Sequence, residues 1–171
     1  MPEPSARVTI GIDPGTAILG YGVVAGDDRI EVLDFGVVET GSKQDMPERL
    51  RILHESMTGL LERHQPDELA VEQLLFGRNV TTAISVGQAR GVVLLAAAQR
   101  GVPVFEYSPA EVKNAIVGYG KADKRQMQEM VRILLELSEV PHPDDAADAL
   151  AVALCHAQTR QFSSHLDSGR Q

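Results

Sequence analysis

The sequence predicts an α/β fold in which a mixed sheet is covered by helices, and three observations carry this prediction. The first 40 residues contain three strand-like runs separated by short turns. The rest of the chain alternates amphipathic helical patterns with short apolar runs. A length of 171 residues, 43% of them hydrophobic, is enough for one domain with a substantial core. We therefore expect a single domain over residues 1–160 and a polar, disordered tail over residues 161–171.

The N-terminal runs predict an antiparallel meander of three strands. β-Branched residues dominate residues 8–12, and strand-like patterns continue over residues 19–24 and 30–39. The first run ends at residues 13–16, Asp-Pro-Gly-Thr, whose Pro and Gly are typical of a tight turn. Residues 25–28, Ala-Gly-Asp-Asp, are typical of a loop, so the second and third strands are expected to form a hairpin.

The central part predicts two helices and two further strands. An amphipathic helix begins near Met46 and ends before Pro66, and a short buried strand follows at residues 68–72. Residues 81–99 are expected to form a helix with small and apolar residues on most of its sides, and residues 102–107 the next strand. So broad an apolar surface indicates that this helix packs against the sheet on one side and against a partner on another.

Three helices are expected in the C-terminal part. Residues 108–111, Ser-Pro-Ala-Glu, match a capping box with Pro at the first helical position, which starts a short helix. Asp123 caps a second helix that runs through Leu137, and a last helix spans about residues 144–158. The chain after Arg160 is polar and is expected to fray.

The charge is unevenly distributed along the chain. A net charge of −8 argues against a nucleic-acid partner, because phosphate binding depends on Lys and Arg. The segment from residue 73 to residue 132, however, carries +4, which leaves −12 for the remainder. Acidic residues gathered around metal ions can belong to a DNA-binding protein, since the ions reverse the local sign of the field.

Cysteine usage and the lack of a targeting pattern predict a soluble, cytoplasmic protein. The single Cys155 lies in an apolar run and is expected to be a buried structural thiol in a reducing compartment. The N-terminal residues lack the pattern of a signal peptide, and no apolar run approaches about 18 uncharged residues.

Four acidic residues stand where a strand ends or a helix begins, far apart in the sequence: Asp13, Glu72, Asp145 and Asp148. Nucleases that cut phosphodiesters with two metal ions need such a set, because hard oxygen ligands must hold two Mg²⁺ ions about 4 Å apart. The chemistry of a two-metal nuclease is therefore one interpretation of these carboxylates.

A purely structural interpretation covers some of the four residues. Asp13 can simply open a turn, and acids at the start of the last helix, with Asp144 as cap, suit the helix macrodipole. This interpretation explains Asp148 poorly. It also leaves Glu72 at the end of a buried strand, where an unpaired carboxylate is costly.

Several blocks of sequence, in order from about Val8 to His156, closely resemble the RuvC family of Holliday-junction resolvases. The blocks are Gly11-Ile12-Asp13-Pro14-Gly15-Thr16, Gly20-Tyr21-Gly22-Val23, Val71-Glu72-Gln73, Gly87-Gln88-Ala89-Arg90-Gly91, Val104-Phe105-Glu106-Tyr107 and Asp145-Ala146-Ala147-Asp148-Ala149-Leu150-Ala151. The resemblance implies a ribonuclease H-like fold, a five-stranded mixed sheet flanked by helices, and a homodimer.

The same resemblance implies an activity and a set of site residues. The protein would nick two strands of like polarity symmetrically across a four-way DNA junction and leave 5′-phosphate and 3′-hydroxyl ends. Asp13, Glu72, Asp145 and Asp148 match the acidic tetrad of the family and would bind two Mg²⁺ or Mn²⁺ ions, although some relatives have His in place of Asp145. The branch-migration proteins RuvA and RuvB would be its partners.

The DNA contacts implied by the resemblance fall in the locally positive segment. They are Lys113, Lys121, Lys124 and Arg125 along the DNA backbone, and Leu75, Phe76, Arg78 and Asn79 in the loop near the junction centre. Many relatives have an aromatic residue where this chain has Leu75, so Phe76 is the candidate for stacking on an unpaired base.

Three rival functions compete with a junction resolvase. The Gly-Ile-Asp-x-Gly-Thr pattern also opens the actin-type ATPase fold, but such proteins need two such domains and a second phosphate loop. Another ribonuclease H-like nuclease acting on RNA would use the same carboxylates. A dimer that binds junctions without cutting them would use the basic segment alone.

Overall fold

The computed structural model describes residues 6–74 and 79–168 and contains a five-stranded sheet with the order β3-β2-β1-β4-β5. The strands are β1 (Val8–Asp13), β2 (Ile18–Ala25), β3 (Glu31–Glu39), β4 (Glu68–Glu72) and β5 (Val104–Tyr107). β1, β2 and β3 pair antiparallel, whereas β4 lies parallel to β1 and β5 parallel to β4. The predicted meander and the predicted five-stranded mixed sheet are confirmed.

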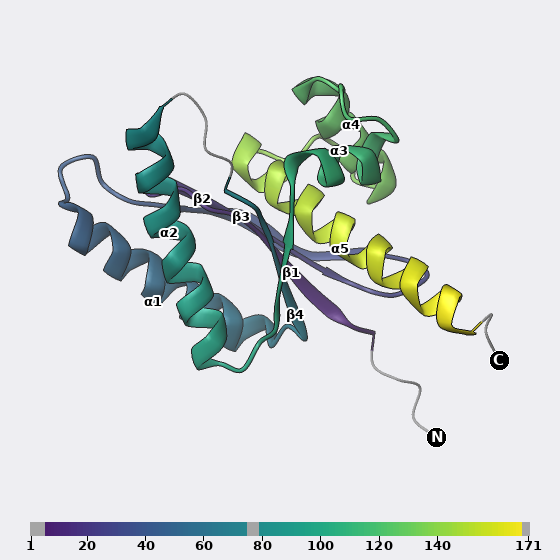
Figure 1. Ribbon diagram of the computed structural model, residues 1–171, viewed down its shortest axis with the longest axis horizontal. Coiled ribbons are helices and arrows are strands. Elements are labelled where there is room, and N and C mark those ends of the chain that lie inside the picture. Colours follow the sequence, from purple (N-terminus) through teal and green to yellow (C-terminus); the bar gives the residue numbers. More distant parts are fainter. Residues whose placement is uncertain (1–5, 75–78, 169–171) are drawn as a thin grey trace.

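Helices cover both faces of the sheet, so the molecule has three layers (Figure 1). The helices are α1 (Met46–His64), α2 (Val80–Gln99), α3 (Pro109–Val117), α4 (Lys124–Leu134) and α5 (Asp144–Ser168). α1 and α2 bury one hydrophobic core against the sheet, and α3, α4 and α5 bury a second core on the opposite face. The second of these layers lies over the edge of the sheet where the predicted acidic residues stand.

Local sequence signals fix the starts of several helices. The side chain of Ser108 accepts a hydrogen bond from the backbone N–H of Glu111, and the Glu111 carboxylate accepts one from the backbone N–H of Ser108, which confirms the predicted capping box. Asp123 caps α4 in the same way together with Gln126, as expected. Each cap satisfies backbone donors that a helix start leaves without partners.

Two predicted helix ends are wrong. α4 ends at Leu134 instead of Leu137, because Glu136 adopts a left-handed φ of 52° that stops the helix. α5 continues to Ser168, whereas the last helix was predicted to end at about residue 158. Its extension follows from Arg160, which bonds to Glu68 and to the loop between β2 and β3, and so holds the helix beyond its predicted end.

α5 lies unusually close to β1 and β2 because glycine lines the contact. A Cβ atom on Gly11 would overlap the carbonyl oxygen of Ala149, and one on Gly20 would overlap the carbonyl oxygen of Asp145. Any larger residue at these positions would push the helix off the sheet. The two glycines therefore set how near the start of α5 comes to the end of β1.

α2 is long and apolar enough to span a membrane by length and composition alone. Its buried side chains, however, belong to the hydrophobic core that it shares with α1, and they include Ala89, Val93 and Ala96. A helix that packs in this way is part of the globular fold. Cys155 is buried and free in the part of the chain that the structure describes, as the sequence predicted.

A buried polar network lies between α5 and the sheet. The Tyr107 hydroxyl is 2.6 Å from His156 Nδ1, and His156 Nε2 is 2.9 Å from Glu68 Oε2. Arg160 donates to the same Glu68 oxygen at 2.6 Å. Burial lowers the pKa of His156, so the neutral ring accepts from Tyr107 and donates to Glu68. Burial raises the pKa of Glu68, but the hydrogen bonds from His156 and Arg160 outweigh burial and leave it lowered.

We expect His156→Ala to lower the free energy of unfolding by about 2 to 4 kcal/mol, because it leaves Tyr107 and Glu68 short of partners and opens a cavity. Urea unfolding followed by circular dichroism measures the change. The matched control is His54→Ala, whose ring contacts Gln99 in an exposed position and whose loss is expected to cost about 0.5 kcal/mol or less. Equal effects of the two substitutions would contradict the role of the network.

Candidate active site

Asp13 and Glu72 end two neighbouring parallel strands. β1 and β4 pair with Ile12 opposite Val71, so the next residues of both strands, Asp13 and Glu72, lie side by side at the carboxyl edge. Adjacent strands are about 4.8 Å apart, which brings two carboxylates within the range of one shared cation. The sheet register therefore places two of the four predicted acids together.

Both carboxylates point toward α5. Residues two apart in a strand share a face, and Gly11 lies directly under α5 while Ala70 belongs to the core beneath it. Asp13 comes two residues after Gly11, and Glu72 two residues after Ala70. Both side chains are therefore on the face of the sheet that α5 covers. Asp145 and Asp148 lie in the first two turns of α5, above the same edge of the sheet.

The electrostatics of the site reflect four acidic groups in one place. Burial and, after it, the carboxylates of Asp148, Asp145 and Glu72 raise the pKa of Asp13 to about 7, while Lys124 lowers it. The pKa values of Glu72 and Asp148 are raised as well. Burial and Asp148 raise the pKa of Glu72, and burial raises the pKa of Asp148 against the opposing effect of Lys124. Carboxylates that disfavour one another's charge are a common sign of a functional site.

Lys124 contacts this acidic group directly. Its Nζ lies 3.1 Å from Asp144 Oδ2 and 3.5 Å from Asp148 Oδ2, so the first residue of α4 bridges two residues at the start of α5. Gln128 donates a further hydrogen bond to Asp144 at 3.0 Å. Lys124 hydrogen bonding, followed by that of Gln128, lowers the pKa of Asp144. Sequence reasoning assigned Lys124 to the DNA backbone and did not foresee this contact, because the pairing of two helix starts leaves no local signal.

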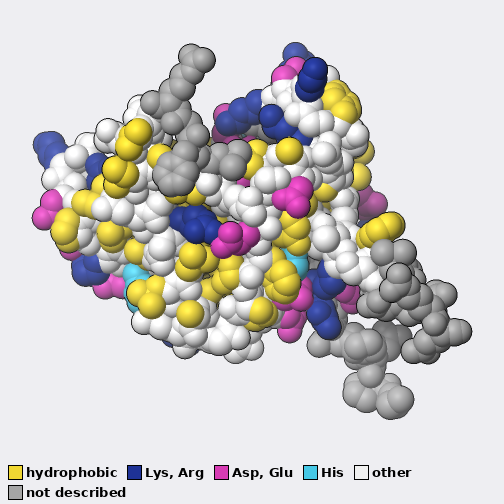
Figure 2. Space-filling model, viewed as in Figure 1, with side chains coloured by type: hydrophobic (Ala, Val, Ile, Leu, Met, Phe, Trp, Pro, Cys, Tyr) yellow, Lys and Arg dark blue, Asp and Glu magenta, His cyan; other side chains and the backbone are white. Residues whose placement is uncertain are grey.

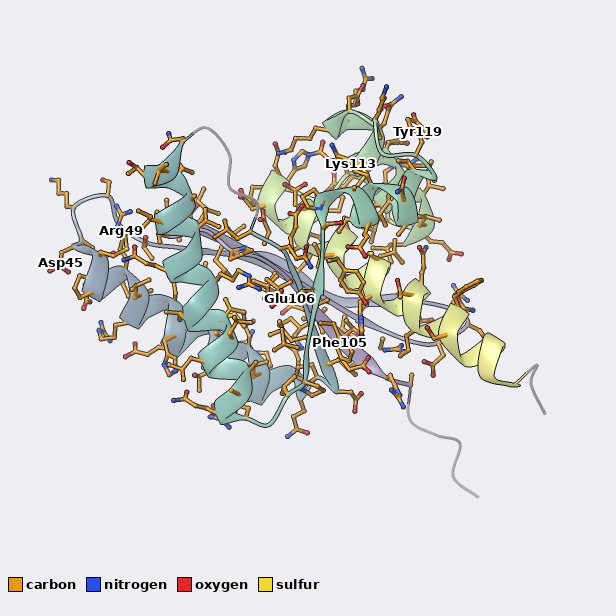
Figure 3. The ribbon with its side chains drawn as sticks, in the orientation of Figure 1. Asp45, Arg49, Phe105, Glu106, Lys113 and Tyr119 are labelled. Carbon is orange, nitrogen blue, oxygen red and sulfur yellow. The ribbon has the colours of Figure 1, made fainter. Side chains whose placement is uncertain are left out.

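A cleft of about 240 Å³ opens beside these residues. Glu72 and Asp148 lie on its acidic side, and Lys113 and Lys124 contribute positive charge to its lining. The positive charge of Lys113 lowers the pKa of Glu72 in opposition to burial. Figure 3 places Lys113 on α3 near the start of α5. A cleft with carboxylates and lysines side by side suits a phosphodiester together with the cations that neutralise it.

The donor set fits divalent cations by its chemistry. All four side chains are carboxylates, which are the hard oxygen ligands that Mg²⁺ and Mn²⁺ prefer. As they stand, no three His, Cys, Asp or Glu side chains of the described residues are placed to hold an ion together. The raised pKa values of Asp13, Glu72 and Asp148 arise in part from mutual repulsion, which a bound cation would relieve.

The predicted DNA contacts separate into different places. Leu75, Phe76 and Arg78 lie outside the described residues, and Asn79 caps α2 by accepting a hydrogen bond from the backbone of Thr82. Lys113 and Lys124 line the cleft, whereas Lys121 is exposed and Arg125 lines a second hollow beside Tyr119. Figure 3 shows Tyr119 on the outer side of the α3 and α4 region. Of the four predicted basic contacts that the structure describes, two thus lie beside the acidic site.

Comparison with known proteins decides the family. The sequence profile of "Crossover junction endodeoxyribonuclease RuvC" matches residues 9–156. The chain belongs to the RuvC family. RuvC of Thermomicrobium roseum is 58% identical over 149 residues, which cover 87% of this chain and 91% of the relative. RuvC of Roseiflexus sp. is 52% identical over 167 residues, which cover 97% and 99% of the two chains.

Solved RuvC structures agree with this fold. RuvC of Thermus thermophilus, solved in complex with a Holliday junction substrate, superposes with a TM-score of 0.88 at 42% identity over 92% of this chain and 96% of that one. The yeast mitochondrial Holliday junction resolvase Ydc2 superposes with a TM-score of 0.69 at 15% identity, over 98% and 86% of the chains, and shares the fold. The ribonuclease H-like fold expected of a RuvC protein is confirmed.

We expect Asp13→Asn to stabilise the metal-free protein at pH 8 by about 1 to 2 kcal/mol. The pKa of Asp13 is about 7 in the folded protein, against an ordinary value of 3.8, so the folded state loses stability as the pH rises through this range. The amide of Asn carries no charge and so avoids this loss. Thermal unfolding in EDTA at pH 5 and pH 8 measures the difference, which should be smaller at pH 5. The control Glu139→Gln makes the same chemical change at an exposed position. A variant less stable than the parent at pH 8 would show that the carboxylates do not repel.

Proposed function

We propose that this chain is a structure-selective endonuclease that resolves four-way Holliday junctions in recombination and repair. One observation carries the proposal: Asp13, Glu72, Asp145 and Asp148 converge on one edge of a sheet beside a cleft that also contains lysine. Further support comes from the T. thermophilus relative, which was solved with a Holliday junction substrate. The products would be two symmetric nicks with 5′-phosphate and 3′-hydroxyl ends.

Two Mg²⁺ ions, which Mn²⁺ can replace, are the proposed cofactors of each site. When bound, they would supply a water of lowered pKa and neutralise the charge that develops on the leaving 3′ oxygen. Asp13 and Glu72, side by side in the sheet register, would hold the ions from below, and Asp148 and Asp145 from above. Lys124, which neutralises Asp148 in the absence of an ion, would be released toward the DNA phosphate.

The DNA is proposed to run across the cleft and along α3 and α4. Figure 2 shows Lys and Arg side chains gathered over these two helices. Lys113 and Lys124 would contact the phosphates nearest the cut, because they line the cleft. The other contacts proposed are Lys121 and Arg125 along the backbone and Leu75, Phe76, Arg78 and Asn79 at the junction centre.

A homodimer is proposed because symmetric nicking of two strands needs two sites. α2 presents three apolar residues on one side. Val80 is 63% exposed, Ile84 58% and Leu95 52%. Arg90 of α2 pairs with Glu106 of β5, and Figure 2 shows a basic and an acidic side chain with hydrophobic ones around them over the same elements. So large an apolar surface is typical of a contact with a second copy.

The cellular setting of this activity follows from the same proposal. An enzyme that cuts junctions during recombination would act in the cytoplasm, and its partners would be the branch-migration proteins RuvA and RuvB. A single buried thiol is consistent with a reducing compartment.

We expect Asp13→Asn and Glu72→Gln to bind four-way junctions as the parent does and to lose cleavage in Mg²⁺ by at least about a thousandfold. Electrophoretic mobility shift in EDTA measures binding, and single-turnover cleavage of a labelled junction measures the reaction. The exposed Glu139→Gln is again the control. Cleavage at the parental rate by either variant would show that the carboxylates are not catalytic.

We expect four-way junctions to outcompete both duplex DNA and RNA hairpins. The protein is titrated with a labelled junction and each unlabelled competitor in turn, at one fixed salt concentration, because phosphate contacts depend steeply on salt. Preferential cleavage of RNA would favour the RNA nuclease, and binding without any cleavage would favour a junction-binding dimer.

A further inference from the structure

The turn after Asp13 is held from two sides by side-chain hydroxyls. Thr16 is 7% exposed, and its Oγ1 lies 2.6 Å from Ser85 Oγ on α2. The carbonyl oxygen of Thr16 accepts a hydrogen bond of 2.5 Å from Thr40 Oγ1, just beyond the end of β3. The backbone N–H of Thr40 in turn donates to Ala17 at 3.0 Å. The turn that follows the first metal-site carboxylate is therefore tied both to the sheet and to α2.

The link to α2 is made in the N-terminal part of that helix, where two large apolar side chains are exposed. The buried residues Ala89, Val93 and Ala96 lie from the middle of α2 onward and belong to the core that α2 shares with α1. In the first two turns, Ala83 is buried, whereas Val80 and Ile84 are exposed. Within the described residues 6–74 and 79–168, the hydrogen bond from Ser85 ties these turns to the buried hydroxyl of Thr16 and so helps to place them.

We infer that Ser85 is a positioning residue of the nuclease, which holds the turn after Asp13 through Thr16 and so sets the affinity of the site for divalent cations. This inference rests on the proposed function, since it assigns a ligand to Asp13. Ser85 itself lies on α2 and acts through Thr16. Groups that orient metal ligands from behind change metal affinity when they are removed.

The inference also connects the site to the exposed side of α2. Ser85 follows directly after Ile84, one of the exposed apolar residues of that helix. Covering this side would restrain the first turns of α2, and the bond between Ser85 and Thr16 passes that restraint to the Asp13 turn. A two-site enzyme would in this way have its carboxylates best ordered when both copies are present.

The test is the binding of Mn²⁺ to the full-length protein without DNA, measured by isothermal titration calorimetry. We expect Ser85→Ala to weaken binding about threefold to tenfold, the range for one net hydrogen bond. Ser85→Thr keeps the hydroxyl and should bind as the parent does. Thr16→Val removes the partner hydroxyl, and combining it with Ser85→Ala should weaken binding no further than either change alone.

The control is Ser163→Ala, because Ser163 is an exposed serine of α5 whose hydroxyl donates to the carbonyl oxygen of Thr159 in its own helix. It lies 18 residues beyond Asp145, or about 27 Å along the helix.

Junction binding in EDTA should be unchanged in Ser85→Ala, and cleavage lost at low Mn²⁺ should return at saturating Mn²⁺. Parental Mn²⁺ affinity in Ser85→Ala, or fully additive losses in the double variant, would overturn the inference. A parent that binds Mn²⁺ and cuts no junction would instead overturn the proposed function.

Discussion

Close packing of α5 against β1 and β2 is the constraint on which the rest of the structure depends. The helix can approach only because Gly11 and Gly20 present no side chain to Ala149 and Asp145. Without this approach the carboxylates at the start of α5 would stand a side chain's width from Asp13, too far to share a cation with it. A packing requirement in the core thus decides whether a metal site can exist at the edge of the sheet.

The two ends of α5 have opposite energetic roles. At its start, carboxylates repel one another and raise the pKa of Asp13 to about 7, so this end destabilises the metal-free fold. Further along, His156 and Arg160 hold Glu68 in a fully bonded network on the same face of the sheet. The network offsets part of the repulsion and keeps α5 in register with the strands. Functional sites commonly carry such a local cost that the remaining structure must balance.

Much of the fold could be predicted from the sequence because its signals are local. The turn after Asp13, the capping box at Ser108 and the periodicity of α1 each depend on residues a few positions apart. The contacts that sequence reasoning missed join distant residues: Lys124 with Asp148, Ser85 with Thr16, and the network that carries α5 past its predicted end. No local pattern marks these pairs. The acids themselves were found by their positions at element ends and by resemblance, whereas their shared face follows only from the register of β1 and β4.

Anomalous diffraction from crystals of the protein grown with Mn²⁺ tests the central claim most directly. The account predicts two anomalous peaks about 4 Å apart, bounded by Asp13, Glu72, Asp145 and Asp148, with Lys124 displaced from Asp148. Manganese bound elsewhere on the surface, with Lys124 still paired to Asp148 and Asp13 without an ion, would contradict it.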